Sequence, residues 1–155
     1  MQDTLNDISD ELSSFLMPLD FFYSKNKSKL PKVFPVHDSN IPQTERKLLA
    51  HQSDMTSTLS NYHGSDLYIE VLDNELNEHY LLRMVVLKKL DDSKPVEFGA
   101  IGIDLSKLNI KMVEEIKEGT KPLGKLLELY NVQYASNPRA YFQIEIDEYI
   151  SKILD

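Results

Sequence analysis

An arginine stands in the middle of an otherwise aliphatic stretch, HYLLRMVVLKK, at residues 79–89. If this stretch is a β-strand, its side chains alternate between two faces, so Arg83 shares its face with Leu81, Val85 and Leu87. A guanidinium is always charged, and taking it out of water without a partner costs several kcal/mol or more. The pattern therefore predicts that an anionic group meets Arg83 on this face.

Two kinds of anion satisfy this prediction. Glu97 or Glu145 on a neighbouring strand would form a structural salt bridge, whereas the carboxylate of a bound ligand would make Arg83 part of a binding site. Glu145 lies on the polar side of its strand, where solvent is the default environment, but its neighbours Tyr141 and Gln143 equally suit a polar cavity. The residues themselves leave both alternatives open.

Motifs for other kinds of chemistry are missing from the sequence. The four histidines, at positions 37, 51, 63 and 79, have none of the short spacings of a zinc site, and we predict no metal. The chain contains no cysteine, so thiolate nucleophiles and disulfides are excluded. It also has neither a glycine-rich nucleotide-binding loop nor the nucleophile elbow of a hydrolase.

Composition predicts a single soluble domain over residues 1–155. The chain is 41% hydrophobic, which is enough for one core. A net charge of −8 and a pI near 5.0 argue against a nucleic-acid partner. No apolar run approaches the roughly 20 residues that span a bilayer, and the start of the chain does not read as a signal peptide. We therefore expect a cytoplasmic protein that binds neither nucleic acid nor membranes.

Helical periodicity marks several segments. Apolar residues from Leu5 to Phe15 predict an amphipathic helix that ends before Pro18, and the following SKNKSKLPKVFP predicts an exposed loop. The segments PQTERKLLAHQ and SDMTSTLSNYHG predict a helical hairpin, with Ser53 as the N-cap of its second helix and Gly64 as the stop. A second hairpin is predicted from NIKMVEEIKEG and PLGKLLELY.

Strand-like alternation fills the middle of the chain. SDLYIEVLDNE, HYLLRMVVLKK and KPVEFGAIGIDL predict three antiparallel strands, because they are rich in β-branched and aromatic residues and have short polar connections. RAYFQIEIDEY alternates again and predicts a late strand that returns to the same sheet. The predicted fold class is α+β, an antiparallel sheet with helices packed against it.

Four of these segments together resemble the chorismate lyase-like family, whose enzymes convert chorismate to 4-hydroxybenzoate and pyruvate. They are LLAHQSDMTSTLSNYHG, YLLRMVVL, KPVEFGAIGIDL and GTKPLGKLLE. The likeness extends from about Leu48 to Glu145 and leaves the helix and loop of residues 1–40 outside it. It implies an antiparallel sheet whose buried site is covered by two helical hairpins.

The resemblance also implies roles for individual residues. Arg83 corresponds to the strand arginine that binds the ring carboxylate, with the backbone around Met55 beside it. Leu123, in the Pro-Leu-Gly turn, would offer a backbone N–H near the far end of the ring. Glu145 would face the ring hydroxyl, either to transfer a proton or to position the substrate. A bidentate pair of guanidinium and carboxylate suits such a buried site.

The implied reaction is an elimination. Chorismate loses its enolpyruvyl group and a ring proton, and the ring becomes aromatic, so that no cofactor is required. The resemblance thus implies a carbon–oxygen lyase acting in quinone biosynthesis, with chorismate as its small-molecule partner. Two alternatives remain, since the same fold serves as an effector-sensing domain that binds small carboxylic acids without catalysis, and since a related lyase would act on a different chorismate-like acid.

Overall fold

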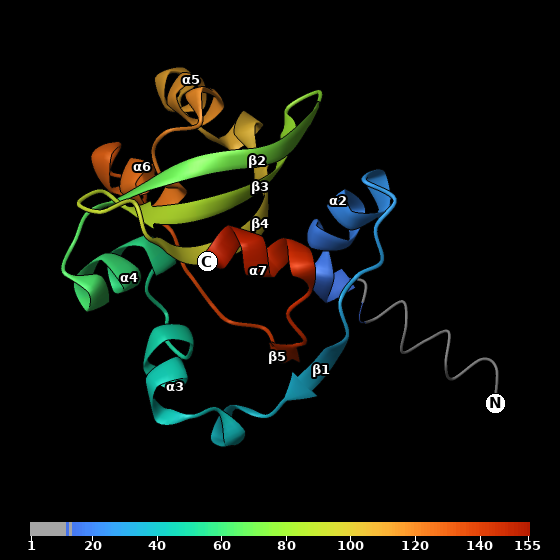
Figure 1. The fold of residues 1–155 in the computed structure, drawn as a ribbon. Coiled ribbons are helices and arrows are strands. Elements are labelled where there is room, and N and C mark those ends of the chain that lie inside the picture. The colour runs from blue at the N-terminus through green and yellow to red at the C-terminus, as the bar shows by residue number, and fades with distance from the viewer. Residues whose placement is uncertain (1–11, 13) are drawn as a thin grey trace.

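The protein has an α+β fold, seen here in a computed structural model that describes Leu12 and residues 14–155 (Figure 1). Its helices and strands are, in chain order, α2 (Leu19–Lys25), β1 (Val33–Val36), α3 (Gln43–Leu49), α4 (Met55–His63), β2 (Leu67–Asn77), β3 (Tyr80–Lys89), β4 (Pro95–Asp104), α5 (Ile110–Glu118), α6 (Leu123–Leu129), β5 (Tyr141–Ile144) and α7 (Glu148–Leu154). Short 3₁₀ turns lie at Asp38–Asn40 and Leu105–Lys107. Most of the helix predicted for Leu5 to Phe15 lies outside the described residues.

Three strands form the antiparallel sheet that the sequence predicts, in the order β2-β3-β4. The strand β3 is central, so the residues at its middle have neighbours on both sides. In the register of β3 and β4, Arg83 lies opposite Ile101 and Leu87 lies opposite Glu97. This register places the arginine and the glutamate on the same face of the sheet, four residues apart along the strands.

The two predicted helical hairpins, α3–α4 and α5–α6, are present. Helices α4, α5 and α6 pack on the face that carries Arg83, and α3 contributes Leu48 at its edge. The face has two separate apolar clusters. One joins Leu81 and Ile103 of the sheet to α5 and α6, and the other joins Val85 and Leu87 to α4. Because Leu81 belongs to the first cluster and Val85 to the second, Arg83 lies between them.

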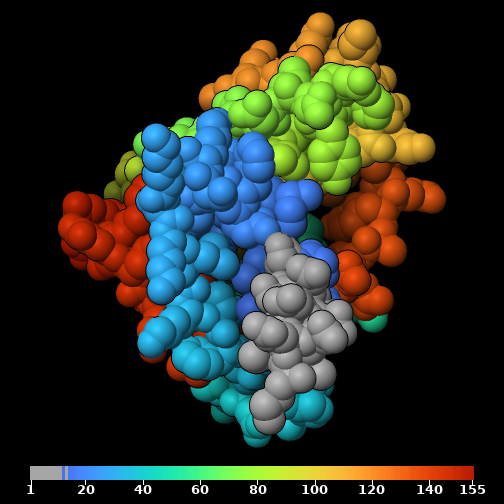
Figure 2. Space-filling view, turned by 90° about the vertical axis from the view of Figure 1, so that its right-hand side faces the viewer, coloured from blue at the N-terminus to red at the C-terminus, as the bar shows by residue number. Residues whose placement is uncertain are grey.

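The opposite face of the sheet is packed against α2 and α7, two helices that the sequence analysis did not predict. Phe22 of α2 and Met84 of β3 are fully enclosed there. The Tyr23 hydroxyl donates a hydrogen bond of 2.6 Å to the Asp147 carboxylate, which joins the two helices. Figure 2 shows the blue residues of α2 directly against the green hairpin of β2 and β3. At that contact Lys25 pairs with the carboxylates of Asp73 and Glu75.

The late strand does not return to the main sheet, which corrects the sequence prediction. Instead β5 pairs with β1 in a separate two-stranded ribbon, seen below the sheet in Figure 1. The strand β1 itself lies in the segment that the sequence predicts to be a loop. It has only four residues and includes Pro35, which a ribbon with free edges tolerates, so its sequence carries little strand signal.

The C-terminal ends of α4 and α5 agree with the predictions, whereas the N-cap of α4 differs. Gly64 and Gly119 end α4 and α5 in the left-handed conformation, with φ of 63° and 72°. The N-cap of α4 is Asp54 rather than the predicted Ser53. The carboxylate of Asp54 accepts a hydrogen bond of 2.8 Å from the Ser57 backbone N–H, whereas Ser53 lies one residue too early to reach it. No helix in the described part of the chain is long and apolar enough to cross a bilayer.

Candidate functional site

A cavity of about 540 Å³ lies over the face of the sheet that carries Arg83. Strands β2, β3 and β4 form its floor, and the first residues of α4 and α6 lie at its rim, together with the chain after α6. Its lining contains four ionisable side chains, those of Asp54, Arg83, Glu97 and Tyr134. The volume suits a small organic ligand.

Only 2% of the surface of Arg83 is exposed, and the residue lies on the floor of the cavity. One terminal N–H of its guanidinium donates a hydrogen bond of 3.2 Å to the Ile116 carbonyl, near the C-terminal end of α5. Its Nε is enclosed and has no hydrogen-bond partner in the described structure. Burial lowers the pKa of Arg83. The group stays cationic at any ordinary pH, so its enclosure leaves an unneutralised positive charge beside the cavity.

The salt bridges considered from the sequence are not formed. Within the described residues, neither Glu97 nor Glu145 makes an ion pair with Arg83. A single hydrogen bond to a neutral carbonyl leaves a buried guanidinium far from satisfied, since it has five N–H donors. Among Leu12 and residues 14–155, therefore, no carboxylate supplies the anion predicted for this face.

Glu97 is the second unsatisfied charged group at the cavity. Its Oε2 is enclosed without a hydrogen-bond partner, and burial raises the pKa of its carboxyl to about 7. Its Oε1 lies only 3.3 Å from the point where a Cβ on Gly99 would stand, so the carboxyl extends along β4 in the direction of Ile101. That direction leads toward Arg83, because Ile101 is the register partner of the arginine.

The cavity rim is held together by Asp54. Its carboxylate caps α4 through Ser57 and accepts a further hydrogen bond of 3.0 Å from the hydroxyl of Tyr134, in the chain after α6. Although burial alone would raise the pKa of Asp54, the hydrogen bonds from Ser57 and Tyr134 outweigh it and hold the pKa below its usual range. Asp54 is therefore ionised, and its carboxylate joins the start of α4 to the chain after α6 at the rim of the cavity.

Gly124 allows the two hairpins to meet at this rim. A Cβ at this position would stand 2.4 Å from Oδ1 of Asp54 and 2.8 Å from Oγ1 of Thr56. Both atoms belong to the start of α4, and the Asp54 carboxylate is held in place by its hydrogen bonds. Only glycine fits this approach of α6 to α4, which closes one side of the cavity.

Three of the four site residues predicted from the sequence lie together. Met55 and Leu123 are the first residues of α4 and α6, and both line the cavity with Arg83. A backbone N–H in the first turn of a helix has no acceptor within that helix, so the start of each helix presents donors at the rim. The resemblance assigns donors of this kind to Met55 and Leu123.

Glu145 lies apart from these three residues. It is exposed at the end of the β1–β5 ribbon, where its backbone N–H donates to the Lys32 carbonyl, and it does not line the cavity. Sequence reasoning considered Glu97 only as a salt-bridge partner. The signal that could have singled it out is its position in PVEFG, on the strand paired with the arginine strand.

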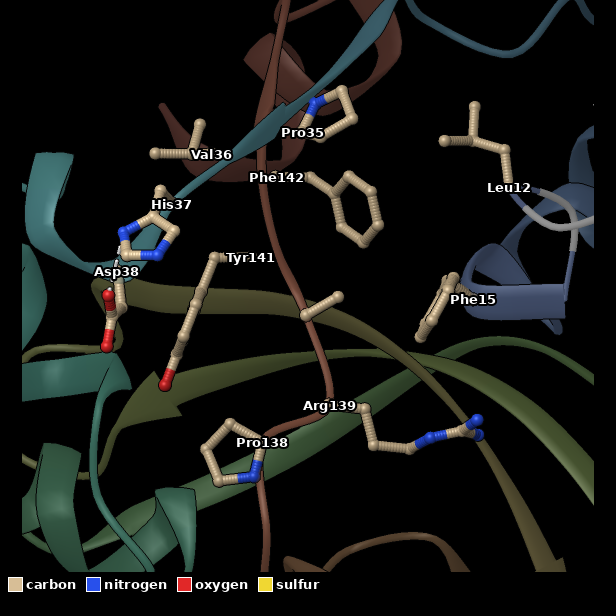
Figure 3. A pocket seen from close by; sticks show the side chains of 11 residues that line it. Leu12, Phe15, Pro35, Val36, His37, Asp38, Pro138, Arg139, Tyr141 and Phe142 are labelled. Carbon is tan, nitrogen blue, oxygen red and sulfur yellow. Dashed lines mark ion pairs between the residues drawn. The ribbon is translucent and has the colours of Figure 1, made fainter. Parts of the chain in front are cut away.

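A second cavity, of about 510 Å³, lies between the ribbon and the N-terminal side of the molecule (Figure 3). Figure 3 shows the Phe142 ring directed toward Phe15, and the two ring centroids are 5.9 Å apart. Arg139 lies over the Phe15 ring, and Nδ1 of His37 lies 3.0 Å from a carboxylate oxygen of Asp38. This cavity therefore lacks the unsatisfied charges of the first.

Comparisons and a search for metal ligands add no further assignment. In Leu12 and residues 14–155, no group of three or more histidine, cysteine or acidic side chains is arranged to hold a metal ion. The chain matches no protein-family model, and comparison with curated proteins and with solved structures yields no match. The function must therefore be argued from the geometry of the cavity.

Proposed function

We propose that the protein is a cofactor-independent lyase that converts chorismate to 4-hydroxybenzoate and pyruvate in the cavity over Arg83. The observation that carries this proposal is the buried guanidinium of Arg83, whose Nε has no partner while the cavity beside it is open to a ligand. A ligand carboxylate would supply the anion that the site lacks and would accept two parallel hydrogen bonds.

The surroundings of Arg83 favour a ring-shaped acid over a flexible polar one. Aliphatic side chains of the floor flank the arginine, among them Val85, Leu87 and Ile101. They would contact the faces of a cyclohexadiene or benzene ring, while backbone donors near Met55 and Leu123 would meet its polar substituents. This combination of apolar walls and few polar groups is typical of small-molecule sites.

In this reaction the protein would orient the substrate and stabilise the charge that develops on the leaving group. Aromatisation of the ring supplies the driving force, so no metal or redox group has to take part. Arg83 would fix the ring carboxylate, and the N–H groups at the starts of α4 and α6 would stabilise negative charge that develops on the departing enolpyruvate. Since the starts of α4 and α6 border the cavity, movement of these helices would precede product release and would limit turnover if it is slow.

The test is incubation of the purified protein with chorismate, followed by chromatographic detection of 4-hydroxybenzoate. We expect stoichiometric 4-hydroxybenzoate and pyruvate from the wild-type protein. The alternative function, a sensor domain that only binds small carboxylic acids, predicts binding of 4-hydroxybenzoate without turnover. The absence of both products over a wide range of protein concentrations would overturn the lyase proposal.

Thermal unfolding measures binding independently of turnover. At a hundredfold excess over Kd, a ligand that binds only the folded state adds about 2.7 kcal/mol to the free energy of unfolding. We expect 4-hydroxybenzoate to raise the unfolding temperature and benzoate to raise it less, because benzoate lacks the hydroxyl. Arg83→Ala should abolish both responses, and Arg83→Lys should restore little, since an ammonium cannot make the two-point contact.

A further inference from the structure

Two carboxyl groups line the cavity in the described structure, and they differ in their partners. Asp54 accepts hydrogen bonds from Ser57 and Tyr134 and is committed to the helix cap. Glu97 has an enclosed oxygen, Oε2, that no donor among the described residues reaches. An enclosed carboxyl oxygen without a hydrogen-bond donor costs folding free energy. Its presence on the cavity floor indicates a functional role in which the oxygen has to be free to contact a ligand.

The separation between Glu97 and Arg83 leaves room for a ligand ring between them. The register sets the two residues four positions apart along β3 and β4, or about 13 Å of strand. Both side chains line the cavity, and Oε1 of Glu97 lies 3.3 Å from the point where a Cβ on Gly99 would stand, on the part of β4 between Glu97 and Ile101. A ligand ring whose carboxylate is held by Arg83 would extend between the two groups, over the floor at Val85.

We infer that Glu97 is the catalytic base of this site and takes the ring proton during the elimination, an assignment that rests on the proposed lyase function. Its carboxylate removes the proton from the ring carbon that bears the hydroxyl. The electron pair of that C–H bond becomes a ring π bond, and the C–O bond to the enolpyruvyl group breaks. The bonding pair of this C–O bond leaves with the enolpyruvate oxygen.

The protonated Glu97 then completes the cycle. Enolpyruvate takes up one proton at its methylene carbon and becomes pyruvate, and the carboxyl of Glu97 returns to the carboxylate form by giving up the proton that it received. The sum is 4-hydroxybenzoate and pyruvate from one chorismate, with no net gain or loss of protons or electrons. The role requires neither an external oxidant nor a metal.

The electrostatics of the cavity suit a base at this position. Burial raises the pKa of Glu97 to about 7, close to the value at which a general base works best near neutral pH. The other ionisable groups that face it do not titrate there. Arg83 stays cationic, the pKa of Asp54 is lowered, and the Asp54 carboxylate raises the pKa of Tyr134 above its usual value.

The decisive experiment compares Glu97→Gln with wild type in steady-state turnover of chorismate. We expect kcat to fall by about a factor of 100 or more, the usual contribution of a positioned base, with KM little changed. Glu97→Asp should recover part of this loss. As a matched control, Glu70→Gln makes the same chemical change at an exposed position of β2 outside the cavity and should leave kcat within about twofold.

Two further measurements separate the possible outcomes. Glu97→Gln should still show the thermal response to 4-hydroxybenzoate, which a variant with a damaged fold would lose. In the wild-type protein, kcat/KM should fall about tenfold per pH unit below about 7. This fall should be absent from the residual activity of Glu97→Gln.

Failure of this inference is distinguishable from failure of the lyase proposal. Wild-type turnover of chorismate with Glu97→Gln within threefold of wild type overturns the assignment of the base and leaves the lyase function standing. If Glu97→Gln does not fold, a wild-type kcat/KM that is flat from pH 5.5 to 8 overturns the assignment by itself. Absence of wild-type turnover overturns both proposals.

Discussion

The two faces of the three-stranded sheet are built from alternate residues of the same strands, yet they differ in kind. On the face toward α2 and α7, Met84 and Val86 are each 2% exposed and are packed among aromatic side chains. On the face toward α4 and α6, Arg83 is as deeply buried but lies beside an open cavity. One face therefore buries aliphatic and aromatic side chains, while the other keeps a desolvated charge beside a cavity.

The two faces contribute to the free energy of unfolding in opposite ways. Burial of Met84 and Val86 contributes favourable free energy through the hydrophobic effect, at roughly 25 cal/mol per Å² of apolar surface. Burial of Arg83 and Glu97 without mutual pairing costs free energy, which the burial of apolar side chains such as Met84 and Val86 must offset. Groups retained at such a cost are typical of ligand sites and active sites.

The largest effects on turnover and stability are expected from substitutions at two neighbouring residues, Arg83 and Met84, whose side chains lie on opposite faces of the sheet. Arg83→Met removes the charge but keeps the bulk, so we expect turnover of chorismate to drop at least a hundredfold while the free energy of unfolding is maintained or raised. Met84→Ala should lower the free energy of unfolding by about 2 to 5 kcal/mol and leave kcat per folded molecule intact. Denaturant unfolding and turnover assays measure the two responses. Equal loss of stability in both variants would break the comparison.

A smaller effect is expected from the dependence of stability on pH. In the folded protein Glu97 keeps its proton up to a pKa of about 7, whereas in the unfolded chain it releases the proton near 4.5. The folded state therefore binds more protons in this window, so its stability falls as pH rises from about 4.5 to about 7 and is constant above it. The full fall is about 3 kcal/mol, at 1.36 kcal/mol per pKa unit.

Glu97→Gln should lack this fall, because an amide does not titrate. Urea denaturation of both proteins at pH 5 and pH 7.5 measures the difference, and Glu70→Gln, at an exposed position of β2, should behave as wild type. A parallel pH dependence in wild type and Glu97→Gln would show that Glu97 is ionised in the folded protein throughout this range.

The smallest effect is expected at Glu145, on the ribbon outside both faces. Because its side chain is exposed and does not line the cavity, Glu145→Gln should turn over chorismate within about threefold of wild type. The same assay as for Glu97→Gln makes the comparison direct. A loss of a hundredfold would instead support the role that the resemblance gives to Glu145 and would imply that the ribbon moves to the cavity.

The sequence by itself determined the α+β class, the three antiparallel strands, the two helical hairpins and the burial of Arg83 on an aliphatic face without a solvent partner. These features depend on local patterns, namely alternation, helical periodicity, glycine at helix ends and a charge within an aliphatic strand. Tertiary structure alone decided that β5 pairs with β1, since a four-residue strand with a proline carries little local signal. It also decided that Glu97 rather than Glu145 shares the cavity with Arg83. That choice depends on register and on which face each strand buries, which are set by contacts between residues distant in the chain.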